Sequence, residues 1–210
     1  MNNVAESELS EDQALAIVSA ADVTRENLVS LSRLKIASKS RKVALALATH
    51  PRIPRHVSIP LVRRMFTFDL LQIALTPAVA PDVKRAAESE ITIRLKSLTV
   101  GERIALARRA STQVLAGLLQ DPDARVLSAA LDNSRLIERT VIASLAQATA
   151  AQTLFKCVGQ HPRWSQKRAV QRALLGSEKT PPKIARQLEK HVSGELLDET
   201  PPQRQRPPDS

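Results

Sequence analysis

The sequence predicts an all-α fold in which short helices pack side by side in a row. Apolar residues make up 43 % of the 210 residues and are mainly Ala, Leu, Val and Ile, whereas aromatic residues make up only 2 %. Strands draw on aromatic and β-branched residues, and Ala and Leu are strong helix formers. Five Gly also leave few residues for hairpin turns. Signals of helix ends recur roughly every 10 to 18 residues, which favours many short helices.

Capping residues give the clearest helix starts. Thr99 and Glu102 have the spacing of a capping box, in which each side chain accepts a hydrogen bond from the other residue's backbone N–H. This pair predicts a helix over residues 101–110. Ser111 is a suitable N-cap for a helix over residues 112–119.

Proline marks further helix starts. Asp121 followed by Pro122 places a capping side chain before a residue that suits the first helical position. Pro60 is an exception because it falls inside the segment 54–65, where we expect a kink or a second helix start. The proline pattern predicts helices over residues 81–98, 122–131 and 181–191.

About a dozen helices of about 8 to 17 residues, joined by very short turns, follow from these signals. Isolated helices of that length are unstable in water, so each must bury its apolar side against neighbours. Repeated short helices with short connections are typical of an α-solenoid. We expect one helical-repeat domain over residues 10–192, between an acidic disordered tail at 1–9 and a disordered Pro/Gln-rich tail at 193–210.

A short signature recurs where one predicted helix ends and the next begins. His50-Pro51-Arg52-Ile53-Pro54 aligns with His161-Pro162-Arg163-Trp164-Ser165. We expect the His to end a helix, the Pro to prevent its continuation, and the apolar Ile53 or Trp164 to fill the space between helix layers. Less regular copies of the signature lie at residues 75–81, 132–136 and 176–181.

Three segments resemble a known group of proteins. Residues 98–110, 118–126 and 160–164 look like segments of bacterial HEAT-like and leucine-rich-repeat-variant helical proteins. The resemblance covers about residues 40–192 and implies a right-handed superhelix of short antiparallel helices that is used for binding. The group shares no catalytic residues. Some leucine-rich-repeat-variant proteins carry an N-terminal Cys-rich cluster-binding segment, which this chain does not match because its single Cys is Cys157.

No set of residues suggests catalysis or metal binding. His50 and His56 are poorly spaced for a metal, with two Pro between them, and Cys157 lies in an apolar helical stretch. Some HEAT-like proteins are alkylpurine DNA glycosylases, which need several aromatic residues around a catalytic acid, and this chain has one Trp, three Phe and no Tyr. We therefore expect a protein that is not an enzyme, with no cofactor and no small-molecule substrate.

Charge is distributed unevenly along the chain. Residues 1–26 carry a net charge of −5, and residues 27–192 carry a net charge of +17. In a solenoid, equivalent positions of successive repeats share one surface, so recurring basic residues could form a continuous positive surface. The candidate binding residues are Arg63, Arg64, Arg108, Arg109, Lys167, Arg168 and Arg172.

This basic surface suggests two kinds of partner. The first is an acidic segment of another protein, bound by a non-catalytic scaffold, and the second is the phosphate backbone of a nucleic acid. An ordinary solvated surface is the alternative to both. We expect a cytoplasmic protein that does not bind a membrane, since no apolar run is long enough to cross one and the N-terminus lacks the features of a signal peptide.

Overall fold

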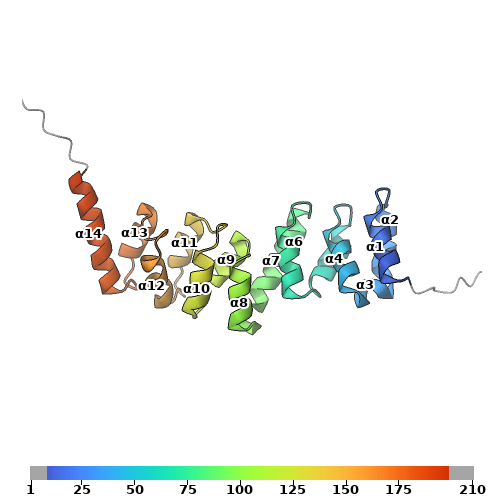
Figure 1. The fold of residues 1–210 in the computed structure, drawn as a ribbon, viewed down its shortest axis with the longest axis horizontal. Coiled ribbons are helices and arrows are strands. Elements are labelled where there is room, and N and C mark those ends of the chain that lie inside the picture. The colour runs from blue at the N-terminus through green and yellow to red at the C-terminus, as the bar shows by residue number, and fades with distance from the viewer. Residues whose placement is uncertain (1–8, 199–210) are drawn as a thin grey trace, which may run out of the picture.

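The computed structural model describes residues 9–198, which fold into α-helices and one 3₁₀-helix with no strand among them. Figure 1 shows the helices following one another along a single long axis, from α1 at one end to α14 at the other. This confirms the all-α prediction. The helices are α1 (Glu11–Ser19), α2 (Arg25–Arg33), α3 (Lys35–Lys39), α4 (Arg41–Thr49), α5 (Arg55–Val62), α6 (Thr67–Leu75), α7 (Pro81–Arg94), η1 (Leu95–Ser97), α8 (Val100–Ala107), α9 (Thr112–Leu118), α10 (Ala124–Leu131), α11 (Glu138–Leu145), α12 (Gln152–Gln160), α13 (Arg168–Leu175) and α14 (Pro182–Asp198).

Several predicted helix starts are confirmed. Thr99 and Glu102 form the expected capping box at the start of α8, and Pro81 is the first residue of α7. Ser111 lies at the N-cap of α9, but its side chain donates a hydrogen bond to Glu88 instead of capping the helix. The hydroxyl therefore ties the start of α9 to the neighbouring helix α7.

Three predicted boundaries are wrong. The N-cap of α10 is Asp123 and not Asp121, because Asp123 accepts a hydrogen bond from the backbone N–H of Arg125. Helix α5 continues through Pro60 to Val62, so the second helix start, one of the two alternatives expected there, is not found. Helix α14 continues past residue 192 to Asp198, into the expected tail. The remaining parts of both expected tails, at 1–8 and 199–210, lie outside the described residues.

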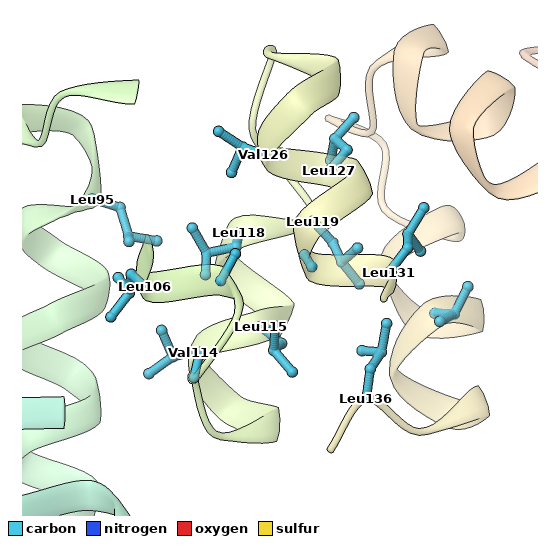
Figure 2. Packing of buried hydrophobic residues seen from close by; sticks show 14 of the residues in the cluster. Leu95, Leu106, Val114, Leu115, Leu118, Leu119, Val126, Leu127, Leu131 and Leu136 are labelled. Carbon is cyan, nitrogen blue, oxygen red and sulfur yellow. The ribbon is translucent and has the colours of Figure 1, made fainter. Parts of the chain in front are cut away.

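Helices that are two apart in the chain pack against each other. Helix α10 contacts both α8 and α12, and α11 contacts both α9 and α13. Leucine side chains fill the space between these two sets of helices, as Figure 2 shows for Leu106, Leu115, Leu118 and Leu131, all of them fully buried. Because the core is continuous from α4 to α14, each short helix is held by its neighbours.

The turns between helices lie along two edges of the array. On one edge, Thr112 donates to the carbonyl of Arg135, and Arg163 donates to the carbonyl of Leu136, which links the turns after α8, α10 and α12. On the other edge, Lys179 donates to the carbonyl of Ala148, which links the turns after α11 and α13. We call the first the His161 edge; it consists of the turns at 20–24, 50–54, 76–80, 108–111, 132–137 and 161–167. We call the second the Phe66 edge; it consists of the turns at 34–40, 63–66, 95–99, 119–123, 146–151 and 176–181.

One hydrogen bond recurs at these turns and explains the repeated signature. A side chain at the C-cap, or one residue after it, accepts a hydrogen bond from the backbone N–H two residues later. His50 and His161 accept through Nδ1, at 3.1 and 3.2 Å, and Asn133 accepts through Oδ1 at 2.8 Å. Ser177 does the same on the other edge. The prediction that His50 and His161 serve as helix ends is therefore confirmed.

An apolar residue follows in the same turn and points into the core. Trp164 is 1 % exposed, and its indole Nε1–H donates to the carbonyl of Leu131 at 2.8 Å. Leu136 and Val79 are buried at the corresponding positions, and Ile53 is partly buried. The predicted burial is confirmed for Trp164, whereas Ile53 is only partly buried where it packs against the core.

A basic side chain also ties each of several turns to the turn before it. Arg52 donates to the backbone carbonyl of Val23, and Lys179 to that of Ala150, in each case across 29 residues of sequence. Arg94 donates to the carbonyl of Met65 in the same way. We call these contacts, with that of Arg163 to Leu136, carbonyl clasps. They satisfy carbonyl groups of turn residues, which lie outside the helices and accept no helical hydrogen bond.

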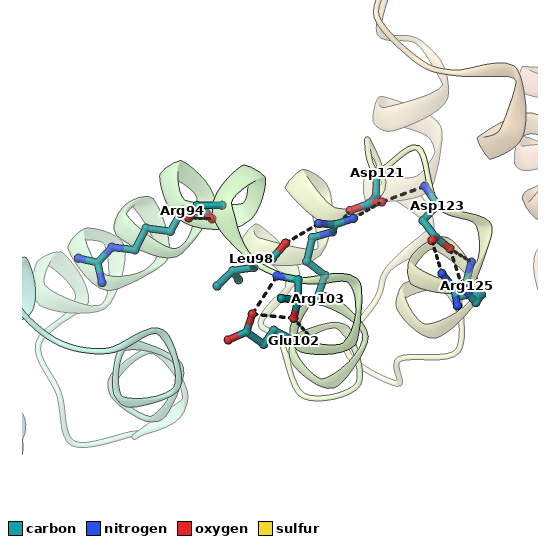
Figure 3. A network of polar contacts seen from close by, with 9 residues as sticks. Arg94, Leu98, Glu102, Arg103, Asp121, Asp123 and Arg125 are labelled. Carbon is teal, nitrogen blue, oxygen red and sulfur yellow. Dashed lines mark hydrogen bonds and ion pairs between the residues drawn. The ribbon is translucent and has the colours of Figure 1, made fainter.

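A buried ion pair fixes the turn between α9 and α10. Arg103 lies between the carbonyl of Leu98 and the carboxylate of Asp121, as Figure 3 shows, with 2.6 Å between Arg103 Nε and Asp121 Oδ2. Asp121 also accepts from the backbone N–H of Asp123 at 2.9 Å. Asp121 therefore orders the turn before the helix, whereas Asp123 caps the helix itself.

Candidate basic binding site

Four of the seven predicted binding residues lie on the His161 edge. Arg108 and Arg109 follow the last turn of α8, and Lys167 and Arg168 stand at the start of α13. All four are exposed. They belong to turns that the hydrogen bonds of Thr112 and Arg163 place in the same row.

The other three predicted residues lie elsewhere. Arg63 and Arg64 belong to the turn between α5 and α6 on the Phe66 edge, and Arg63 lies 4.0 Å from the carboxylate of Glu90. Arg172 lines a hollow of about 430 Å³ between α11 and α13, together with Lys179. The structure thus divides the seven residues between the two edges and one helix face.

Sequence reasoning missed three basic residues on the His161 edge. Arg135, Arg139 and Arg163 are exposed and lie in or beside the turns between those of Arg109 and Lys167. A usable signal was present, because Arg109, Arg135 and Arg163 each directly precede the buried apolar residue of the turn. We call the combined surface the basic edge; it consists of Arg108, Arg109, Arg135, Arg139, Arg163, Lys167 and Arg168.

Most of these cations have no internal counter-charge. Among the described residues, no carboxylate forms an ion pair with Arg108, Arg109, Arg135, Arg139 or Lys167. Exposed arginines elsewhere differ, since Arg55 and Arg125 each lie within 2.8 Å of a carboxylate oxygen. The unpaired guanidinium groups leave a positive potential over three successive turns.

Two contacts order part of the basic edge. The guanidinium of Arg163 lies over the ring of Trp164, with 4.3 Å from its central carbon to the ring centroid, while it also donates to the Leu136 carbonyl. His161 Nε2 lies 3.1 Å from the carboxylate of Asp132. Asp132 and Glu138 are the carboxylates closest in sequence to these cations. These contacts position the turn that carries Arg163 and Lys167.

Other reactive side chains occupy structural positions. Burial raises the pKa of the Cys157 thiol, which keeps it protonated near neutral pH. Burial, and then the charge of Arg52, lower the pKa of His50, so its Nδ1 stays free to accept the hydrogen bond of the turn. Within residues 9–198, three or more His, Cys, Asp or Glu side chains nowhere gather closely enough to hold a metal ion.

Comparison of the chain with protein-family models, with curated proteins and with solved structures gives no match. In the described part of the chain, each helix is too short or too polar to cross a membrane.

Proposed function

We propose that this chain is a non-catalytic, cytoplasmic scaffold with a HEAT-like, right-handed α-solenoid fold, and that its basic edge binds an acidic segment of another protein. The observation that carries the proposal is a row of exposed cations on three successive turns of one edge, of which Arg108, Arg109, Arg135, Arg139 and Lys167 form no ion pair among the described residues. Arginine forms bidentate hydrogen bonds with carboxylates, and equivalent turns of a solenoid present such groups at regular intervals.

The spacing of the turns suits an extended acidic segment. Helices that pack side by side lie about 8–10 Å apart, so successive turns on one edge have a similar separation. An extended chain rises about 3.3 Å per residue. A partner with a carboxylate at about every third residue could therefore contact the turns of Arg109, Arg135 and Lys167 in succession.

Nucleic acid is the alternative partner for the same edge. Trp164, the aromatic residue nearest to these arginines, is buried and cannot stack on a base. Binding through this edge would then be limited to phosphate contacts. A nucleic acid releases condensed counterions when it binds, so its affinity falls more steeply with salt than that of an acidic peptide.

Charge reversal tests the proposal with a matched control. The double variant Arg109→Glu/Arg135→Glu should weaken binding of a fluorescent polyglutamate peptide by about tenfold or more at low salt. The control Arg64→Glu/Arg186→Glu makes the same change in net charge at exposed residues away from this edge. It should leave most of the affinity intact.

Three results would contradict this assignment. Equal loss in both double variants would mean that net charge, and not the basic edge, determines binding. Preferential, steeply salt-dependent binding of duplex DNA or RNA over polyglutamate would favour the nucleic-acid alternative. Absence of any binding at low salt would remove polyanions as partners.

A further inference from the structure

Exposed apolar side chains gather on the Phe66 edge, in the N-terminal half of the array. Phe66 is 67 % exposed, Phe68 is 40 % exposed and Ile93 is 69 % exposed. The chain has only three Phe and one Trp, and the other two of these aromatic residues, Phe155 and Trp164, are buried. Half of the large aromatic side chains thus lie on one part of the surface, where they do not stabilise the core.

Polar contacts tie together the ends of the two helices that carry these side chains. Phe66 and Phe68 stand at the start of α6, and Ile93 lies in the last turn of α7. Its neighbour Arg94 donates to the backbone carbonyls of Arg63 and Met65, in the turn directly before Phe66. The last turn of α7 is therefore tied to the segment that carries the rings. Large exposed apolar side chains that gather in one region of a surface mark interaction sites.

The ring of Phe66 is positioned by a cation. The guanidinium carbon of Arg41 lies 5.3 Å from the centre of the ring, and two nitrogens of the same group donate to both oxygens of Asp69 at 2.7 Å. Asp69 is buried, so Arg41 is fixed by a bidentate pair and in turn supports one side of the ring. The exposed ring is thus held in place before any partner arrives.

The charge around the rings is positive. The two carboxylates of this region are already engaged, Asp69 by Arg41 and Glu90 by Arg94, which lies 3.3 Å away. The contact of Arg63 with Glu90 is loose, with 4.0 Å between Arg63 Nε and the carboxylate oxygen, and the Arg63 side chain is largely exposed. Lys96 is exposed and forms no ion pair among the described residues. Cations therefore surround apolar side chains with few free carboxylates between them.

We propose that Phe66, Phe68 and Ile93, flanked by Arg41 and Arg63, form a second docking surface, which binds a short protein segment where acidic residues alternate with large apolar ones. The apolar side chains of the segment contact the rings and its carboxylates contact the guanidinium groups. This surface differs from the basic edge in position and in chemistry, and it does not depend on the function proposed for that edge.

The N-cap position of Phe66 offers a clean test. The side chain of Phe66 makes no capping hydrogen bond to α6. A Ser at an N-cap accepts a hydrogen bond from a backbone N–H of the first helical turn. Phe66→Ser therefore removes the ring without destabilising α6. The test variant is Phe66→Ser/Phe68→Gln. The control is Ile137→Ser, which replaces the exposed apolar N-cap of α11 on the opposite edge.

The probe is a labelled synthetic peptide in which Asp alternates with Leu and Trp, measured by fluorescence anisotropy with the full chain. Wild type and Ile137→Ser should bind it equally, and the double variant should bind about tenfold or more weakly with unchanged circular dichroism. The same loss should appear when Phe66→Ser/Phe68→Gln is introduced into the Arg109→Glu/Arg135→Glu background, which separates this surface from the basic edge.

Four outcomes would overturn the proposal. They are undiminished binding to the double variant, complete competition by polyglutamate, no binding of the peptide to the wild type, and a self-associating wild type that becomes monomeric in the double variant. The last result would assign the surface to a second copy of this chain.

Discussion

The two edges of the array share one construction and differ in what they expose. On the His161 edge, Arg163 clasps the carbonyl of Leu136, and on the Phe66 edge Lys179 clasps the carbonyl of Ala150. Both edges also use a side chain at or directly after the C-cap that accepts a hydrogen bond from the backbone N–H two residues later. Features that recur on both edges are therefore best explained by the needs of the fold.

The exposed side chains are what distinguish the edges. The His161 edge carries Arg108, Arg109, Arg135, Arg139 and Lys167, which form no ion pair among the described residues, and the Phe66 edge carries Phe66 and Phe68 at the start of α6. Neither set helps to bury a helix or to satisfy a backbone group. Cations whose main contact is a clasp, such as Arg52 and Lys179, are therefore structural. Arg163 clasps a carbonyl and also lies exposed within the basic edge. Cations and rings outside the clasps are the candidates for binding.

The largest expected effect concerns the buried residue of a turn. Trp164→Ala should lower the free energy of unfolding by about 3–5 kcal/mol, because it leaves a cavity and an unpaired carbonyl at Leu131. Urea titration followed by circular dichroism measures this change. Ile137→Ala, at an exposed position of the same edge, should change stability by less than about 0.5 kcal/mol. Similar losses in both variants would remove the distinction between buried and exposed turn residues.

The next effect concerns Asn133, which has a buried side chain that holds two turns together. Its Nδ2 donates to the carbonyl of Ala107 at 2.7 Å, and its Oδ1 accepts from Arg135. Asn133→Ala should cost about 1–3 kcal/mol in urea unfolding, because it leaves a buried carbonyl without its partner. A neutral result would mean that water replaces the amide.

The clasps should contribute less, and equally on both edges. Arg52→Met and Lys179→Met each keep much of the aliphatic side chain and remove the donor to Val23 or Ala150. Each should lower the free energy of unfolding by about 1 kcal/mol, and the double variant should show the sum, because the two sites are distant. If only one variant loses stability, the clasps do not form a common device.

The smallest effect is a pH dependence at His50. The pKa of His50 is lowered from 6.5 in the folded protein. The contribution of His50 to stability is therefore complete above about pH 6.5 and is lost as the pH falls from 6.5 towards the lowered pKa. His50→Asn keeps an acceptor, as Asn133 does at the equivalent turn, and should abolish this part of the pH dependence. Thermal unfolding of both proteins between pH 5 and pH 8, about the window in which His titrates, provides the test. If the melting temperatures of the two proteins change with pH in the same way, the prediction is wrong.

The sequence predicts local features well. The capping box of Thr99 and Glu102, the Pro81 helix start and the burial of Trp164 all depend on nearby residues, and all three are confirmed. The choice between Asp121 and Asp123 as the N-cap fails for a long-range reason. Asp121 is taken by Arg103, from the start of α8, which no local pattern reveals.

The candidate site was harder to predict because it depends on which turns share an edge. Basic pairs such as Arg63-Arg64 and Arg108-Arg109 look equivalent in the sequence, yet they belong to opposite edges. The hydrogen bonds of the carbonyl clasps show which turns share an edge. They connect residues about 27 to 31 apart in the sequence, and the residue types that they join follow no common motif. Arg135 and Arg139 were missed because a single Arg is not a conspicuous cluster.

Hydrogen–deuterium exchange of the full chain, with and without polyglutamate at low salt, tests the central claim most directly. If the basic edge binds acidic segments, protection should increase at the turns 108–111, 132–137 and 161–167 and stay unchanged at 63–66. Protection centred on residues 63–66, or spread evenly over both edges, would contradict the assignment of binding to the His161 edge.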